Sequence, residues 1–66
     1  MLLRNNLKSW RHKMEMNQKE FAAFLEIDGK LYNRWERQKS QPSLQMALKI
    51  SIKLRCTVND LFEIIE

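Results

Sequence analysis

The chain has 66 residues and a net charge of +4, which leaves room for one domain with a small core, expected to cover residues 1–66. Its single Cys and single His exclude an internal disulfide framework and leave a metal site short of ligands. No apolar run approaches the roughly 20 residues that span a bilayer, and no signal peptide is recognised, so we expect a cytoplasmic protein.

A first helix is predicted from Leu2 to Met14. The apolar residues Leu3, Leu7, Trp10 and Met14 recur at helical spacing and form a single stripe. This stripe is expected to face the core.

A second helix is predicted to begin at Asn17. Asn17 and Glu20 have the spacing of a capping box, in which each side chain satisfies a free backbone N–H at the start of the helix. Phe21, Ala22 and Leu25 form its inward face.

A third helix is predicted to begin at Asp28, a good N-cap whose charge suits the positive end of the helix dipole. Tyr32 and Trp35 lie three residues apart on its inner side. Residues 17–36 therefore have the pattern of two short helices joined by a tight turn, which is typical of a helix-turn-helix unit.

Two further helices are predicted after a polar loop over residues 38–42. The residues of the fourth helix expected to face inward are Leu44, Ala47, Leu48, Ser51 and Leu54. The fifth helix follows Thr57, which has capping-box spacing with Asp60, and it carries Val58, Leu61, Phe62 and Ile65. Because Gly and Pro occur once each and no long alternating β pattern is present, the fold class is predicted to be all-α with five short helices.

Positive charge is concentrated in the second half of the chain. Residues 29–55 carry seven basic side chains and one acidic one, whereas residues 1–28 carry five and four, and residues 56–66 carry three acidic ones alone. A basic segment of this kind is the expected electrostatic footprint of a polyanion binder, although a solvated face would have the same composition.

Short motifs at fixed spacing cover most of the chain. They are Leu7-Lys8 with Trp10-Arg11, Gln18 with Glu20-Phe21-Ala22, Leu25 with Ile27-Asp28, Tyr32 with Arg34-Trp35-Glu36, Pro42-Ser43, and Ile50, Leu54, Thr57 and Leu61-Phe62. With these motifs the chain resembles the Cro/repressor-type (XRE-like) helix-turn-helix family from Leu7 to Phe62. The resemblance implies a compact five-helix, lambda-repressor-like fold.

The chain departs from the family pattern at three positions. Glu26 and Gln38 stand where the family usually has Gly, and Glu26 is expected to adopt a left-handed backbone at a cost of about 1 kcal/mol. Gly29 stands where many relatives present a side chain to the bases. Its lack of a side chain would allow the backbone to approach DNA closely.

The resemblance implies that the third helix enters the DNA major groove. The residues expected to read bases are Lys30, Leu31, Asn33 and Arg34, because Lys and Arg donate to guanine, Asn pairs with adenine and Leu contacts the thymine methyl. The residues expected to bind phosphate are Gln18, Arg37, Lys39, Ser40 and Gln41, with help from the N-terminus of the second helix. Arg11 and Glu36 match positions that form a structural ion pair in some relatives.

These features predict a sequence-specific, double-stranded DNA-binding transcription regulator of bacterial or phage type, most simply a repressor. It is expected to act as a homodimer on half-sites about 34 Å apart. The dimer contacts are expected at Leu61, Phe62, Ile64 and Ile65, with closure of the core as their alternative role. No cofactor, metal, membrane or small-molecule substrate is expected.

Two other functions are alternatives to this one. The same fold could serve as a protein-interaction module, such as an antitoxin or adaptor, through an exposed apolar surface on the fifth helix. Binding of single-stranded nucleic acid would need exposed aromatic residues among the basic ones, whereas the aromatic residues here are expected to face inward. An enzyme has little support, since no catalytic triad, carboxylate pair or Gly-rich phosphate loop is present.

Overall fold

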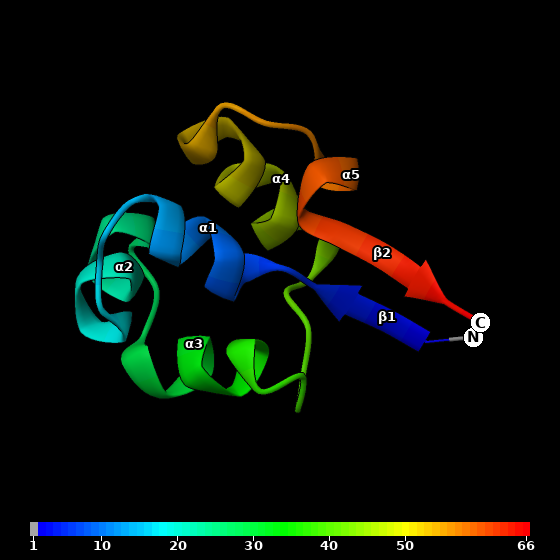
Figure 1. Cartoon of the computed structure of the whole chain (residues 1–66), viewed down its shortest axis with the longest axis horizontal. Coiled ribbons are helices and arrows are strands. Elements are labelled where there is room, and N and C mark those ends of the chain that lie inside the picture. The colour runs from blue at the N-terminus through cyan, green and yellow to red at the C-terminus, as the bar shows by residue number, and fades with distance from the viewer. Residues whose placement is uncertain (1) are drawn as a thin grey trace.

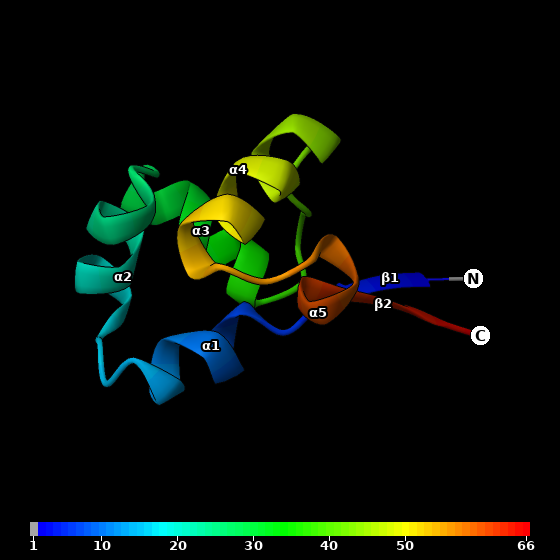
Figure 2. The same ribbon diagram turned by 90° about the horizontal axis from the view of Figure 1, so that it is seen from above.

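The computed structural model describes residues 2–66, so Met1, the first residue of the predicted domain, lies outside the described residues. The elements in chain order are β1 (Leu2–Asn5), α1 (Leu7–Lys13), α2 (Gln18–Leu25), α3 (Gly29–Glu36), α4 (Leu44–Leu54), α5 (Val58–Leu61) and β2 (Phe62–Ile65). The helices gather at one end of the long axis, and the two strands project from the other end, where both termini lie (Figure 1). A view from above shows the same arrangement (Figure 2).

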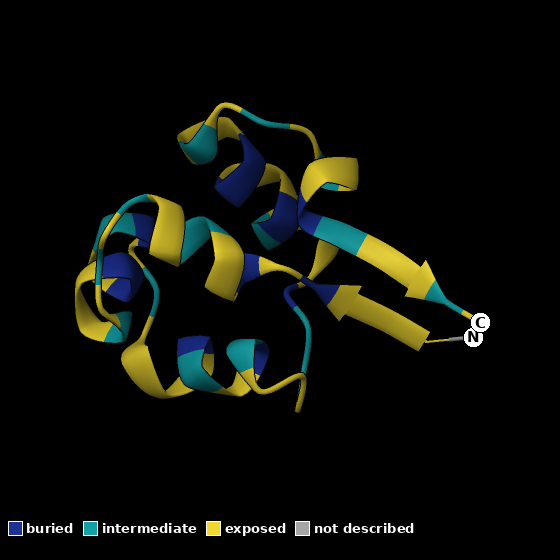
Figure 3. Ribbon diagram, viewed as in Figure 1, coloured by how far each residue is buried: buried dark blue, intermediate teal, exposed yellow. Residues whose placement is uncertain are grey.

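The core lies between the inner faces of the helices. Its buried residues are Leu7, Phe21, Ala22, Leu25, Tyr32, Trp35, Ile50 and Leu61. Buried segments lie on these inward helix faces, while most of the strand ribbon is exposed (Figure 3). The predicted inward faces of α2 and α3 are confirmed, but in α4 the side chains of Leu44 and Leu48 are exposed and Ile50 is buried instead.

The predicted helix caps of α2, α3 and α5 are confirmed. The Asn17 side chain accepts from the backbone N–H of Glu20 at 2.8 Å, and the Glu20 carboxylate accepts from that of Asn17 at 2.9 Å. Asp28 accepts from two N–H groups in the first turn of α3, and Thr57 forms a second capping box at α5. Local side-chain chemistry thus sets where these helices begin.

The all-α prediction is wrong at both ends of the chain. The first helix begins only at Leu7, because Leu2–Asn5 forms β1, and the fifth helix stops at Leu61, because Phe62–Ile65 forms β2. The two strands pair antiparallel, with Leu3 opposite Ile64. The structure therefore has five helices and a small two-stranded sheet within residues 2–66. Segments of four residues are too short for periodicity to separate helix from strand.

Glutamine side chains hold the outer edge of β1 against the loop that follows α3. The Gln38 amide accepts from the backbone N–H of Asn5 at 3.1 Å and donates to its C=O at 3.0 Å. The buried Asn5 side chain donates to the C=O of Trp35 at 2.8 Å and to the side chain of Gln41 at 2.8 Å. Gln41 in turn donates to the C=O of Leu3. This network fixes the base of the strand ribbon to the helical body.

Candidate nucleic-acid interface

A tight turn joins α2 to α3. Glu26 ends α2 with a backbone φ of 61°, the left-handed conformation that its position predicts. Across the turn, the rings of Phe21 and Tyr32 meet edge to face with their centres 5.5 Å apart. Aromatic pairs favour this geometry, so the contact fixes the angle at which α3 leaves α2.

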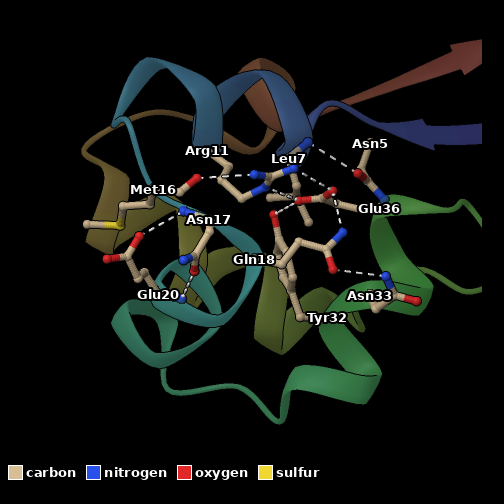
Figure 4. Close-up of polar contacts among 10 residues, drawn as sticks. All are labelled: Asn5, Leu7, Arg11, Met16, Asn17, Gln18, Glu20, Tyr32, Asn33 and Glu36. Atoms are coloured by element: carbon tan, nitrogen blue, oxygen red, sulfur yellow. Dashed lines mark hydrogen bonds and ion pairs between the residues drawn. The ribbon is translucent and has the colours of Figure 1, made fainter.

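The Glu36 carboxylate joins α1, α2 and α3 through four hydrogen bonds (Figure 4). Arg11 donates to it from Nε at 2.6 Å and from Nη2 at 3.2 Å, and Gln18 donates from Nε2 at 3.0 Å. The hydroxyl of Tyr32 donates to the same carboxylate. The Arg11 and Glu36 side chains are only 12% and 3% exposed, so this ion pair belongs to the interior of the domain.

The network sets the charge state of its members. Burial alone would raise the pKa of the Glu36 carboxyl, but the hydrogen bonds from Arg11, Tyr32 and Gln18, together with the Arg11 charge, hold that pKa below its ordinary value. The hydrogen bond to Glu36 raises the pKa of Arg11. Burial and the hydrogen bond to Glu36 raise the pKa of the Tyr32 hydroxyl. At neutral pH the site therefore contains a carboxylate, a guanidinium and a neutral phenol.

Gln18 connects this network to the outer side of α3. Its Oε1 accepts from Asn33 Nδ2 at 3.0 Å, while its Nε2 donates to Glu36. Each of the two amides still has one N–H free of these contacts, and Asn33 also keeps its Oδ1. Gln18 and Asn33, predicted from the sequence to bind phosphate and to read a base, are therefore held in place by internal contacts and can still offer a donor outward.

The outer face of α3 is basic and exposed. Lys30, Leu31 and Arg34 are exposed on the helix, and Arg37 and Lys39 are exposed just beyond its end. Within residues 2–66, no hydrogen bond or ion pair joins these four basic side chains to another residue. The structure thus brings the predicted base-reading residues together on one accessible surface, next to two of the predicted phosphate contacts.

The helix N-termini contribute less to anion binding than the sequence suggested. Asp28 accepts from the N–H groups of Lys30 and Leu31, so a carboxylate already occupies the N-terminus of α3. Glu20 places another carboxylate at the start of α2. Attraction for phosphate therefore depends on side chains, because these carboxylates repel a second anion.

Lys19 is a candidate phosphate contact that the sequence analysis missed. It is exposed at the start of α2, beside Gln18. With Gln18, Ala22, Ala23, Ile27 and Gly29 it lines an open hollow of about 440 Å³ between α2 and the first turn of α3. Its position directly after the predicted phosphate contact at Gln18 was the signal that could have identified it.

Two predicted phosphate contacts, Ser40 and Gln41, do not present free polar groups to solvent. The hydroxyl of Ser40 is buried, and the Gln41 amide already bonds to Asn5, Leu3 and Gln38. We therefore remove both from the interface. The Gln41 side chain holds β1 in place instead of presenting its donors to a ligand.

The four residues predicted to form dimer contacts differ in how far they are buried. Leu61 is fully buried in the core, so it cannot contact a second molecule without unfolding. Ile64 is 54% exposed, while Phe62 and Ile65 are half-buried. The predicted set therefore combines a core residue with surface residues.

No described helix has the length and apolar character needed to cross a membrane. Among residues 2–66, no cluster of three or more His, Cys, Asp or Glu side chains could hold a metal ion.

Comparison with known proteins gives a family match and a likeness to solved structures. The model of the helix-turn-helix family matches residues 7–61. Among solved structures, the chain is similar to the crystal structure of a candidate DNA-binding protein from Bacteroides fragilis, with a TM-score of 0.79 and 24% identity, over 94% of this chain and 100% of that chain. No curated protein matches the sequence. At this level of identity, the structural likeness establishes a shared fold.

Proposed function

Since this chain belongs to the Cro/repressor-type (XRE-like) helix-turn-helix family, as the match over residues 7–61 shows, we propose that it is a sequence-specific transcription regulator that binds double-stranded DNA. The observation that carries the proposal is the exposed basic face of α3, whose cations have no internal partner among the described residues. Unpaired cations on one exposed helix suit a polyanion whose grooves admit a helix.

The two groups of exposed side chains have different roles in this proposal. On α3, Lys30 and Arg34 lie one turn apart and donate to guanine, while Leu31 contacts a thymine methyl and Asn33 pairs with adenine. Side chains at the edges of this face bind phosphates and set the position of the domain on DNA. These are Gln18, Lys19, Arg37 and Lys39.

The regulator acts as a homodimer, since one short recognition helix reads few base pairs and a pseudo-palindromic site doubles the contacts. Bound across a promoter, such a dimer represses by excluding the polymerase. A bacterial or phage origin and a cytoplasmic location remain predictions that accompany this function.

Binding to a pool of random duplexes tests the proposal. Fluorescence anisotropy is measured at low and at physiological salt. At physiological salt, one class of sequences should remain bound while the other duplexes of the pool dissociate. Weak binding that is uniform across sequences and disappears with salt would contradict the proposal, because phosphate attraction alone behaves in this way. The protein-interaction module would then become the better explanation.

Two substitutions separate base reading from phosphate binding. Arg34→Ala should reduce the preference for the selected sequence by about tenfold or more, corresponding to the 1–3 kcal/mol of a base contact. Lys39→Ala should weaken all sequences alike and lower the salt dependence by about one phosphate contact. If both variants weaken binding to all DNA sequences equally, α3 does not read bases as proposed.

A further inference from the structure

We propose that a second copy of this chain docks on an apolar face at the strand end of the molecule, around a two-fold axis. This surface, called here the sheet-end face, consists of Leu3, Leu44, Val58, Phe62 and Ile64. The inference rests on the proposed dimeric regulator and identifies the surface through which the two copies meet.

The strand register places part of this face on one side of the ribbon. Leu3 is opposite Ile64, and Asn5 is opposite Phe62. Paired residues, and residues two apart along a strand, share a face, so Leu3, Phe62 and Ile64 lie on the same side. Phe62 is half-buried there, while Leu3 is 45% exposed and Ile64 is 54% exposed.

The start of α4 extends the same surface beyond the ribbon. A groove of about 210 Å³ is lined by Leu3, Pro42, Leu44, Ala47, Val58 and Phe62. A second groove of about 240 Å³ shares Leu3, Val58 and Phe62 and is also lined by Asn59, Glu63 and Ile64. Beside the first groove, the Leu44 side chain is 72% exposed. A surface that carries both an apolar projection and an apolar groove can be complementary to itself, as a two-fold interface requires.

Charge favours a second copy as the occupant. All five residues of the sheet-end face are uncharged, so two identical faces can meet without opposing like charges. Glu63 also lines the second groove, but its carboxylate is paired with Arg4 at 2.6 Å, so the pair is neutral as a unit. By contrast, the exposed Leu48 and Ile52 further along α4 are each followed directly in the chain by a lysine, so a two-fold contact there would bring basic side chains near one another.

The dimensions of the molecule also favour this end. The domain measures 32 × 23 × 21 Å, and the strand ribbon lies at one end of the long axis (Figures 1 and 2). A two-fold axis at that end, perpendicular to the long axis, places the centres of the two copies about one molecular length apart, close to the roughly 34 Å between half-sites on one side of DNA. Because α3 lies along one long side of the molecule, an axis perpendicular to the long axis can keep both recognition helices on the same side (Figure 1).

This face differs from the C-terminal contacts predicted from the sequence. Leu61 is in the core, and Ile65 pairs with Leu2 on the opposite side of the ribbon. Leu3 and Leu44, which were expected to face the core, join the face because folding brings the N-terminal strand and the start of α4 beside β2.

Sedimentation of the full chain without DNA tests the inference. The parent protein should sediment as a dimer of 8.0 kDa chains. Leu44→Asp should raise the dissociation constant of the dimer roughly 100-fold, because two charges are then placed in an apolar interface. Since Leu44 is the first residue of α4, Asp also suits the helix dipole there, and the variant should keep its helical circular dichroism.

Two further variants complete the test. Ile52→Lys changes an even more exposed apolar residue of the same helix outside the face and should leave the dimer intact. Ile64→Lys changes the face on a different element and should weaken the dimer as Leu44→Asp does. A parent that stays monomeric both free and on selected DNA overturns the inference, as does a folded Leu44→Asp variant that dimerises like the parent. Failure to select a DNA sequence would instead refute the proposed function and leave the sedimentation result valid.

Discussion

Glu36 shows how much a single residue contributes to the placement of α3. Its carboxylate accepts from Arg11 of α1, Gln18 of α2 and Tyr32 of α3. Because the ion pair is buried, removal of one partner leaves the other charge without compensation, which is more costly than loss of an exposed pair. The charged form of Glu36 therefore stabilises the contacts that hold α1, α2 and α3 together.

The stability of the protein should depend on pH through Glu36. Its pKa in the folded state is below the ordinary value of 4.5, so its contribution to stability is complete above that value and is lost as the pH falls through the folded-state pKa. We expect Glu36→Gln to lower the free energy of unfolding by about 3 kcal/mol at neutral pH. Urea unfolding should show that this difference from the parent shrinks under acid conditions.

Glu63→Gln is the matched control for this experiment. Glu63 pairs with Arg4 at 2.6 Å, but both side chains are more than half exposed. An exposed pair contributes about 0–1 kcal/mol, so this variant should unfold almost like the parent at every pH. A difference between Glu36→Gln and the parent that does not change with pH would show that the charge of Glu36 is not the source of its contribution to stability.

Gly29 allows stability and DNA binding to be separated at one residue. A Cβ atom at this position would meet nothing within 4 Å apart from its chain neighbours and the backbone of its own helix, and the backbone φ is not positive. Gly29→Ala should therefore raise the free energy of unfolding by about 0.5 kcal/mol. In our proposal the same methyl group blocks close approach of DNA, so affinity in anisotropy should fall. Unchanged affinity would show that the backbone at Gly29 does not approach the DNA.

At the scale of the elements, each of the four longer helices ends near a residue with a left-handed backbone. These residues are Glu15, Glu26, Gln38 and Arg55, with φ between 55° and 61°. The chain has Gly at none of these positions, although Gly adopts this conformation most easily. The turns are therefore strained, and the packing of the helices on either side holds them in place.

Replacement of Glu26 by Gly should relieve this strain between α2 and α3. We expect Glu26→Gly to raise the free energy of unfolding by about 0.5 kcal/mol, after allowing for the greater freedom of Gly in the unfolded chain. Glu26→Ala is the control, since it also removes the exposed contact with Lys49 at 3.6 Å but keeps the strained Cβ. Thermal unfolding of the three proteins should rank the Gly variant highest, and equal stability of the Gly and Ala variants would contradict the explanation.

At the scale of the whole molecule, two surfaces are separated along the long axis. The basic face of α3 lies on the helical body, and the sheet-end face lies where both termini meet (Figure 1). In our proposals, DNA binding and association therefore use different residues, so that each should be open to change without the other.

If two copies associate through the sheet-end face, thermal stability should depend on protein concentration. Association that is possible only in the folded state shifts the folding equilibrium by mass action. The Tm of the parent should therefore rise when its concentration is increased, whereas the Tm of the Leu44→Asp variant should stay constant. Calorimetry of both proteins over a concentration series provides the measurement, and a parent Tm that is independent of concentration would count against the dimer.

The sequence by itself determined the features that depend on near neighbours. Asn17 with Glu20, the cap at Asp28, the capping box at Thr57 and the left-handed turn at Glu26 could all be predicted, because each depends on a few adjacent residues. The same holds for the exposed positions of Lys30 and Arg34, since helical spacing separates them from Tyr32 and Trp35.

Only the tertiary structure decided the features that depend on residues far apart in the chain. The segments that form β1 and β2 are separated by nearly the whole chain, and each becomes a strand because the other supplies its hydrogen bonds. Gln41 has the composition of a loop residue that could bind phosphate, yet its amide is fully engaged by Asn5, Leu3 and Gln38. Leu44 fits the helical pattern of an inward residue but is exposed, because burial depends on which elements fold against α4. Local pattern predicts the elements, whereas which elements pack together decides which side chains remain free to bind.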